Sequence, residues 1–222
     1  MKKNQIAIYG AGGFAREVAW LVETCNKNKK NYEVVCYIDD NPEKEGKKLN
    51  GYSVLNLRTF RELYPHAKVV IGVGFPQTRQ AIEEKAVLAG YGFATIIHPG
   101  VEMSPWVKIG DGTVICAGNI LTTNITLGKQ VQINLDCTIG HDVVMEDYVT
   151  LAPGVHVSGW VHLGNRVYVG TGAVIINGTE EAPIRIGDDA IIGAGACVIE
   201  SVAKGLTVTG VPAKPVDIKV AR

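Results

Sequence analysis

The stretch from Val107 to Gly172 decides the fold, because it divides without a gap into VKIGDG, TVICAG, NILTTN, ITLGKQ, VQINLD, CTIGHD, VVMEDY, VTLAPG, VHVSGW, VHLGNR and VYVGTG. The third place of every hexapeptide is hydrophobic: Ile109, Ile115, Leu121, Leu127, Ile133, Ile139, Met145, Leu151, Val157, Leu163 and Val169. The same spacing continues at Ile175 and, after five extra residues within 177–183, resumes at Ile186, Ile192 and Val198. A period of six predicts a parallel β-helix, in which three hexapeptides form one coil.

The interior of this β-helix is predicted from two places of the repeat. The third-place side chains point inward and stack on their equivalents in the coils above and below. Four places later stands a small or β-branched residue that fills the remaining space, with Asn119 as the exception. Coils stack about 4.8 Å apart, and such an interior leaves little room for aromatic side chains.

Residues 1–98 have a different composition and pattern. Of the 15 aromatic residues, 11 lie in residues 1–100, whereas 33 of the 49 Val and Ile residues lie in 101–222. Strands are expected at 5–9, 33–38, 69–74 and 93–97, and helices at 14–22, 57–65 and 78–88. This alternation predicts a parallel sheet of the half-Rossmann type. We therefore expect an α/β domain over 1–98 and an all-β domain over 99–222.

A glycine-rich turn joins the first expected strand and helix. The spacing Gly10-x-Gly12-x-x-Ala15, with Asp39 after the second strand, resembles a dinucleotide-binding fingerprint. Glycine lets the backbone approach a phosphate, and a helix N-terminus offers unpaired N–H groups. The alternative is a tight turn beside a surface acidic pair. Because only about 98 residues precede the repeat, a mononucleotide fits this domain better than a dinucleotide.

The charge balance and the cysteines exclude several classes of protein. The chain carries 22 basic and 22 acidic residues, split as net +4 over 1–100 and net −4 over 101–222, which argues against a nucleic-acid binder. It has no apolar run long enough to span a bilayer and no evident signal peptide, so no membrane span is expected. Five dispersed cysteines without a C-x-x-C motif indicate reduced thiols in a cytoplasmic protein.

His141 is the candidate general base. It stands at a predicted corner, is followed by Asp142, and is preceded in the same coil by Asn134. A neutral imidazole can accept a proton from an amine or hydroxyl, and a neighbouring carboxylate would orient it. Gly159 occupies the equivalent place one coil later, so it should stack over His141, and its N–H could face a thioester oxygen. The alternatives are an ordinary corner histidine and a glycine that only serves its turn.

At this point the sequence resembles a known group of enzymes. The hexapeptides, together with VTGVPAK at 208–214, are similar to the acyltransferases of the left-handed β-helix superfamily. GAGGFAREV at 10–18, YIDDN at 37–41 and IGHD at 139–142 narrow the resemblance to the sialic-acid O-acetyltransferase family. That family also holds nucleotide-aminosugar N-acetyltransferases of bacillosamine and perosamine pathways.

The resemblance implies the site residues. His141 would be the general base and Asp142 its partner, with Asn134 helping to place the substrate. Acetyl-CoA would lie in a groove between subunits of a homotrimer, near Thr150, Gly159, Thr171 and Ala194. The nucleotide sugar would contact Gly12, Gly13, Phe14, Asp39, Asp40, Gly72 and Arg79. Thr150 and Phe14 depart from the family pattern, because relatives can carry a second histidine and a polar residue at these places.

The expected activity is therefore acetyl-CoA-dependent N-acetylation of a nucleotide-linked amino sugar, with no metal required. O-acetylation of sialic acid or a related sugar is the first alternative. A metal-dependent β-helix enzyme, like the γ-type carbonic anhydrases, needs three converging imidazoles, and the spacings of His141, His156 and His162 do not match whole coils. A non-enzymatic nucleotide-binding scaffold is the remaining alternative. Residues 177–183 either cover the cofactor or widen a corner.

Overall fold

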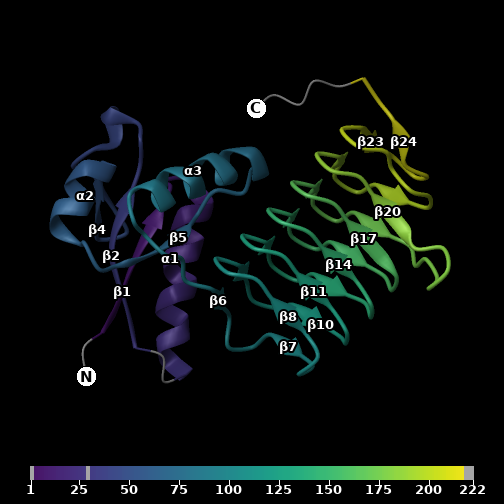
Figure 1. Cartoon of the computed structure of the whole chain (residues 1–222), viewed down its shortest axis with the longest axis horizontal. Coiled ribbons are helices and arrows are strands. Elements are labelled where there is room, and N and C mark those ends of the chain that lie inside the picture. The colour runs from purple at the N-terminus through teal and green to yellow at the C-terminus, as the bar shows by residue number, and fades with distance from the viewer. Residues whose placement is uncertain (1–2, 29–30, 218–222) are drawn as a thin grey trace. The chain divides into compact units, whose positions relative to one another are not determined.

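The computed structural model describes residues 3–28 and 31–217. Contacts divide the chain into two units, one of residues 1–99 with 111–114 and one of residues 100–110 with 115–222. Figure 1 shows the helices confined to the first unit and the stacked strands forming the second. The division follows helix–strand alternation and the hexapeptide repeat, except that residues 111–114, which belong to the repeat, group with the first unit.

The first unit contains a five-stranded sheet in the order β3-β4-β2-β1-β5. Its strands are β1 (Asn4–Tyr9), β2 (Tyr32–Ile38), β3 (Lys48–Leu49), β4 (Tyr52–Leu55) and β5 (Lys68–Ile71). Its helices are α1 (Gly13–Cys25), α2 (Leu57–Leu63) and α3 (Pro76–Leu88), with 3-10 turns η1 (Asn26–Asn28) and η2 (Pro42–Lys44). Strand β1 pairs in parallel with both β2 and β5, which confirms the predicted parallel sheet.

Two details of the first unit differ from the sequence prediction. The antiparallel pair β3–β4 was not expected, and β4 extends the parallel sheet by pairing with β2. The strand expected at 93–97 is reduced to a single bridge between Val69 and Phe93, followed by the short strand β6 (Ile96–Ile97). Within this unit the N–H of Ile96 donates to the carbonyl of Thr113, 2.9 Å away.

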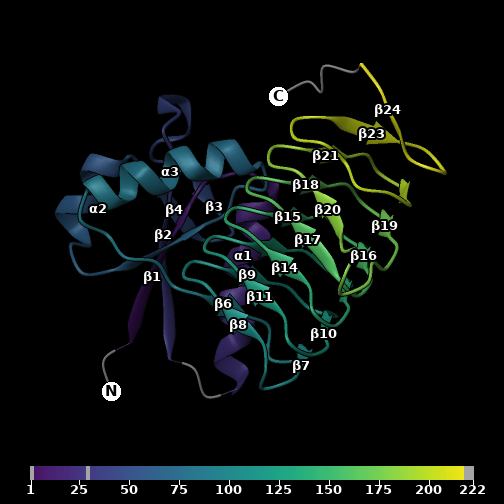
Figure 2. The same cartoon turned by 45° about the vertical axis from the view of Figure 1, so that its right-hand side comes forward.

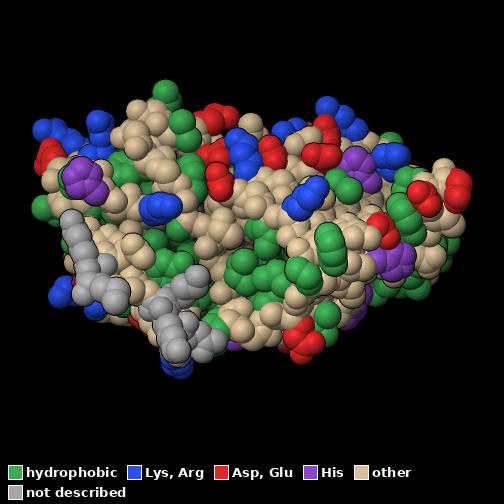
Figure 3. Space-filling view, turned by 60° about the horizontal axis from the view of Figure 1, so that its bottom comes forward, with side chains coloured by type: hydrophobic (Ala, Val, Ile, Leu, Met, Phe, Trp, Pro, Cys, Tyr) green, Lys and Arg blue, Asp and Glu red, His purple; other side chains and the backbone are tan. Residues whose placement is uncertain are grey.

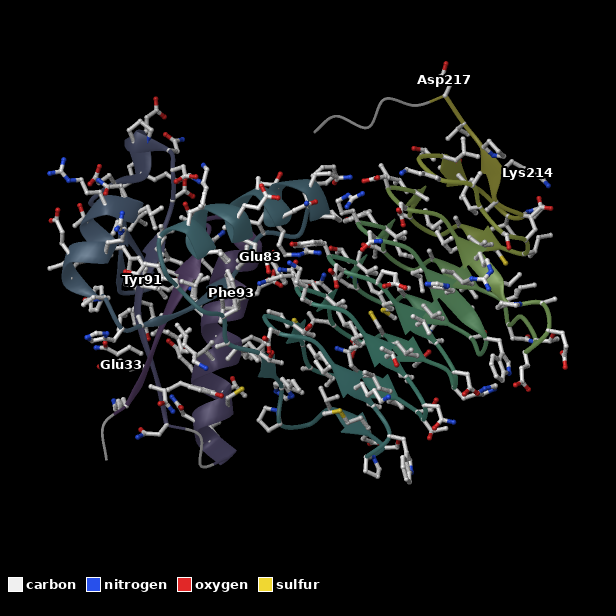
Figure 4. The ribbon with its side chains drawn as sticks, viewed as in Figure 1. Glu33, Glu83, Tyr91, Phe93, Lys214 and Asp217 are labelled. Atoms are coloured by element: carbon white, nitrogen blue, oxygen red, sulfur yellow. The ribbon has the colours of Figure 1, made fainter. Side chains whose placement is uncertain are left out.

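Both faces of this sheet are covered, which explains the hydrophobic composition of its central strands. A Cβ added at Gly72 would lie 2.6 Å from the Cα of Ala15 on α1 and 3.0 Å from the side chain of Ile8. On the opposite face, Tyr9 belongs to a buried cluster that includes Phe60 of α2 and residues of α3. Tyr91, labelled in Figure 4, stacks on Phe60 with ring centroids 4.7 Å apart. Large aromatic side chains thus fill the space between helix and sheet.

The second unit is a left-handed parallel β-helix with three sheets, as predicted (Figure 2). One sheet holds β7 (Glu102–Met103), β10 (Ile120–Leu121), β13 (Thr138–Ile139), β16 (His156–Val157), β19 (Val174–Ile175) and β22 (Cys197–Val198). The next holds β8 (Lys108–Ile109), β11 (Thr126–Leu127), β14 (Val144–Met145), β17 (Val161–Leu163) and β20 (Ile184–Ile186). The third holds β9 (Val114–Ile115), β12 (Gln132–Ile133), β15 (Thr150–Leu151), β18 (Tyr168–Val169), β21 (Ile191–Ile192), β23 (Thr207–Thr209) and β24 (Lys214–Pro215).

The stacking register confirms the predicted coil of three hexapeptides. Ile139 lies opposite Leu121 on one side and Val157 on the other, each at the equivalent place of an adjacent coil. From Ile115 to Val198 the third-place side chains are at most 3% exposed, while Ile109 is only partly buried. Asn119, the exception among the small residues, is 1% exposed. Its amide nitrogen donates to the carbonyls of Cys116 and Asn134, and its oxygen accepts from the N–H of Cys137.

The corners of the β-helix require left-handed backbone at the sixth place of each hexapeptide. From residue 112 to residue 172 the sixth-place φ angles lie between 55° and 76°. The residues are Gly112, Gly118, Asn124, Gln130, Asp136, Asp142, Tyr148, Gly154, Trp160, Arg166 and Gly172. Glycine, Asn and Asp adopt this conformation readily, whereas bulky side chains do so at a cost. Tyr148 and Trp160 are therefore the unusual corner residues.

The last coils are interrupted and then closed. Residues 177–183 form a loop at the corner between β19 and β20. Near the start of this loop the N–H of Gly178 donates to the carbonyl of Gly159. At the far end, β24 pairs antiparallel with β23, and the side chain of Lys214, labelled in Figure 4, donates to Glu200.

Figure 3 shows exposed charged and hydrophobic side chains interspersed over one face of the molecule. Among the described residues no helix is long and apolar enough to cross a membrane. All five cysteines are free thiols.

Candidate active site

His141 and Asp142 form a hydrogen-bonded pair at the corner between β13 and β14. Nδ1 of His141 lies 2.8 Å from Oδ2 of Asp142. A carboxylate only accepts hydrogen bonds, so Nδ1 carries the proton, and in the neutral ring the lone pair is on Nε2. The imidazole is 54% exposed and the carboxylate 25%. The corner therefore presents to solvent an imidazole that is oriented by a carboxylate, and its role as a general base remains a prediction.

Gly159 lies directly beside the His141 ring in the next coil. A Cβ added at Gly159 would lie 2.5 Å from Cε1 and 2.6 Å from Nε2 of His141. The φ of Gly159 is outside the left-handed region, so the turn itself does not require glycine. The His141 ring occupies the space that a Cβ at Gly159 would need, which accounts for a glycine here. The contact of the Gly159 N–H with a thioester oxygen remains a prediction.

Trp160 also contacts the imidazole, and the sequence analysis missed it. The ring centroids of His141 and Trp160 are 6.3 Å apart at an interplanar angle of 84°, an edge-on arrangement. Trp160 stands one full coil after Asp142, so the coil length that identified Gly159 could have identified Trp160 as well. We call His141, Asp142, Gly159 and Trp160 the His141 corner.

Asn134 is part of the β-helix interior. Its side chain is 9% exposed, and its amide nitrogen donates to the carbonyl of Leu151, 3.0 Å away. Its own carbonyl accepts from the side chain of Asn119. The amide nitrogen predicted to help place a substrate is thus already used inside the β-helix. A role for Asn134 toward substrate remains a prediction.

The predicted cofactor residues fall into two groups. Thr171 and Ala194 are exposed and occupy one corner in successive coils, where Gly195 N–H donates to the carbonyl of Thr171. This corner precedes β19 and β22, whereas His141 follows β13 in the same sheet, so the two corners flank that sheet. Thr150 is 1% exposed in β15. Its side chain does not offer the surface that a contact with cofactor requires.

The other two histidines of the repeat lie on different sheets and are bound to their neighbours. Nδ1 of His156 is 2.8 Å from the hydroxyl of Thr138. Nε2 of His162 is 2.9 Å from Glu146, and its Nδ1 is 2.9 Å from Nη1 of Arg185. Within residues 3–28 and 31–217, no group of three or more His, Cys, Asp or Glu side chains could hold a metal ion.

In the first unit, Asp39 holds the glycine-rich turn. Its carboxylate accepts from the N–H groups of Ala11 and Asn41, both at 3.0 Å, and pairs with Lys44 at 2.9 Å. Burial disfavours the ionised form of Asp39, but these donors outweigh it and hold its pKa below the usual range. Gly10 adopts a φ of 113° in this turn, a conformation that requires glycine.

Asp40 belongs to a chain of polar groups around a hollow of about 270 Å³. It accepts a hydrogen bond from the hydroxyl of Tyr9 at 2.9 Å and pairs with Lys85 at 2.7 Å. Burial, and secondarily Asp40, raises the pKa of Tyr9. Thr78 and Ile82 of α3 also line the hollow. Tyr9 and Lys85 were missed by the sequence analysis, because only the fold brings them to Asp40.

The remaining residues that were predicted to bind the substrate differ in how exposed they are. Gly12 and Gly13 are exposed at the start of α1, and Phe14 is half-buried behind them. Gly72 packs against the backbone of Ala15, so its role is close helix–strand packing. These residues do not line the hollow beside Asp40.

Arg79 corrects the sequence prediction. Neither a contact with a substrate phosphate nor a surface salt bridge fits its position, because it is fully buried. Its Nη1 donates to the carbonyls of Val73 and Gly74, each 3.0 Å away. The guanidinium therefore fixes the loop between β5 and α3 from inside.

Comparisons with known proteins extend over nearly the whole chain. Residues 5–86 match the family described as the PglD N-terminal domain. GDP-perosamine N-acetyltransferase of Escherichia coli O157:H7 is 35% identical over 215 residues, which span 95% of this chain and 96% of that protein. WeeI from Acinetobacter baumannii AYE has a TM-score of 0.88 at 36% identity, covering 95% of this chain and 99% of that chain.

Solved structures similar to this chain also include complexes with ligands, and one of them is a histidine-to-asparagine mutant of perosamine N-acetyltransferase from Caulobacter crescentus in complex with CoA and GDP-perosamine. Its TM-score is 0.85 at 26% identity, covering 96% of this chain and 97% of that chain. Both units are therefore shared with these proteins.

Proposed function

The chain belongs to the PglD-like family of sugar acetyltransferases, and on this basis we propose that it acetylates the amino group of a nucleotide-linked amino sugar with acetyl-CoA. The observation that carries the proposal is the His141–Asp142 pair, an oriented and half-exposed base at a corner of the β-helix. The ligands of the Caulobacter crescentus relative, CoA and GDP-perosamine, support the same two substrates here.

The proposed chemistry is direct transfer with His141 as general base. Nε2 of His141 accepts a proton from the amine while the amine nitrogen forms its bond to the acetyl carbon. As the carbon–sulfur bond breaks, the electron pair goes to sulfur, and His141 returns the proton to give the free thiol. Asp142 stabilises the imidazolium between these two proton transfers. The N–H of Gly159 is the proposed donor to the thioester oxygen.

The nucleotide is proposed to occupy the first unit. The hollow beside Asp40 offers a carboxylate, the Tyr9 hydroxyl and the ammonium of Lys85 within one lining. Gly12 and Gly13 are exposed, and a Cβ added at Gly12 would meet nothing within 4 Å, so the turn leaves room for a phosphate. The net +4 charge of residues 1–100 suits an anionic ligand.

The residues present fit a groove for acetyl-CoA. Thr171 and Ala194 are small and exposed on a corner that flanks the same sheet as the His141 corner. A thin ligand along this sheet would pass from Ala194 and Thr171 toward His141. Such a groove needs a second wall, and we propose that a neighbouring subunit supplies it in a homotrimer. The cytoplasm, where acetyl-CoA and nucleotide sugars are made, is the proposed location.

The test is thiol release from acetyl-CoA with UDP-, GDP-, dTDP- and CMP-linked amino sugars as acceptors, and with free sialic acid as the hydroxyl acceptor. The wild type should act on a nucleotide amino sugar, and His141→Ala should lower kcat by at least about a hundredfold with little change in KM. His162→Ala is the matched control, a histidine of the repeat on another sheet, and should keep the rate. An unchanged rate for His141→Ala would remove the proposed base.

A further inference from the structure

Trp160 has the largest side chain among the residues with left-handed backbone. Its φ is 56°, and the other non-glycine residues at positive φ are Asn, Asp, Gln, Arg and Tyr. A bulky residue in this region is strained, and such strain persists where function selects the side chain. Glycine, Asn or Asp would serve the corner without this strain, as they do in other coils. The fold itself therefore does not explain a tryptophan here.

The backbone of Trp160 is held on both sides. Its N–H donates to the carbonyl of His141 at 3.1 Å, and its carbonyl accepts from the N–H of Ile184 at 3.0 Å. Ile184 follows the 177–183 loop, whose other end is tied to Gly159. These two hydrogen bonds join Trp160 to the coil of His141 and to the residue that follows the loop. They fix the backbone from which the indole projects.

The imidazole of His141 has few restraints of its own. With 54% of its side chain exposed, it is bounded by the carboxylate of Asp142 on one side and by the backbone of Gly159 on another. The Asp142 hydrogen bond fixes Nδ1 but leaves the ring able to pivot about that atom. The indole of Trp160, edge-on at 6.3 Å between ring centroids, is the aromatic side chain that packs beside the imidazole.

We propose that Trp160 is a positioning residue for His141. Its indole keeps the imidazole over Gly159, so that Nε2 faces the acceptor amine rather than turning into solvent. Trp160 touches neither the acetyl group nor the amine in this assignment. The inference rests on the proposed function, because it assumes that His141 is the base.

The main test replaces Trp160 by a residue that suits left-handed backbone. Trp160→Asn removes the indole and relieves the strain, so its melting temperature should equal or exceed that of the wild type. Its kcat should fall at least tenfold, its KM for both substrates should change less than twofold, and its pH–rate profile should shift. Trp160→Phe keeps an aromatic edge and should recover most of kcat. Arg166→Asn, the same change at the sixth place of the next hexapeptide, should leave kcat unchanged.

Three outcomes would overturn the proposal: a Trp160→Asn variant with wild-type kcat, equal losses in Trp160→Phe and Trp160→Asn, or a raised KM with unchanged kcat. The last would make Trp160 a wall of the substrate site.

In selectively labelled wild-type protein, nuclear Overhauser effects should link the His141 ring to the indole of Trp160. Their absence would also refute the contact, whatever the variants do. His141→Ala tests the base separately: a retained rate in this variant would reject His141 as the base and with it the positioning role of Trp160, whereas a lost rate in His141→Ala with a wild-type rate in Trp160→Asn would reject the positioning role alone.

Discussion

Replacing Gly159 by alanine should displace the imidazole of His141 without unfolding the β-helix. The added Cβ would lie 2.5 Å from Cε1, 2.6 Å from Nε2 and 3.0 Å from Nδ1 of the ring. Non-bonded carbon atoms prefer about 3.5–4.0 Å, so the ring must move by roughly 1 Å. It can do so because it is more than half exposed. The φ of Gly159 permits alanine, so the cost in unfolding free energy should stay below about 1 kcal/mol.

The expected loss of activity follows from this displacement. A misplacement of about 1 Å at a reacting group can cost about a hundredfold in rate, which corresponds to about 2.7 kcal/mol in the activation free energy. Gly159→Ala should therefore lower kcat by about that factor. Because alanine keeps the N–H that is proposed to face the thioester oxygen, and because the proposed nucleotide residues are untouched, KM for both substrates should change little.

The assay is thiol release at saturating substrates, with thermal melting measured on the same preparations. A double-mutant cycle with His141→Ala supplies the control. Once the imidazole is absent, Gly159→Ala should lower the remaining rate by less than about twofold. If Gly159→Ala alone keeps kcat within about threefold of the wild type, the position of the imidazole does not limit the reaction and the reasoning is wrong.

Three further predictions concern binding, folding and pH. Lys85→Met removes the cation beside Asp40 and should raise KM for the nucleotide sugar about tenfold with kcat unchanged; an unchanged KM would place the nucleotide elsewhere. Asn119→Val removes three hydrogen bonds to buried backbone groups, the carbonyls of Cys116 and Asn134 and the N–H of Cys137, and should lower the free energy of unfolding in urea by about 3 kcal/mol or more, whereas a loss below about 1 kcal/mol would contradict this. Asp39→Asn should destabilise the protein most above pH about 4, since the pKa of Asp39 is lowered on folding and its contribution disappears as pH falls through that pKa. A difference between the two proteins that grows in acid would refute the last prediction.

The β-helix was predictable because each of its restraints is local and repeated. A side chain such as Ile139 is buried by its equivalents one coil before and one coil after it, so the spacing alone states which residues touch. The exception is instructive. Ile109 belongs to the first coils and remains partly exposed, although its place in the hexapeptide is the same. Periodicity predicts which way a side chain points, but its burial also depends on the neighbouring coils.

The first unit was harder to predict because its contacts have no period. Arg79 stands at the start of a helix, a place that suits a phosphate ligand, yet the fold buries it and turns it toward the carbonyls of Val73 and Gly74. Likewise, Lys85 reaches Asp40 across 45 positions of sequence. The sequence predicted that Arg79, at the start of α3, contacts the substrate, but only the packing of α3 decides that Lys85 and not Arg79 faces the hollow.

Departures from the repeat gather at one corner of successive coils. His141 is an imidazole at the fifth place, Gly159 beside it accommodates the ring, and Trp160 has strained backbone where the corner tolerates glycine. The next coil then leaves the repeat at residues 177–183, whose base donates to the Gly159 carbonyl. These features stand at equivalent places of successive coils, so the repeat that forms the β-helix also stacks them on one another. Stacking explains the ordinary positions of the repeat but not these exceptions, and they surround the imidazole, which is what a site built around His141 requires.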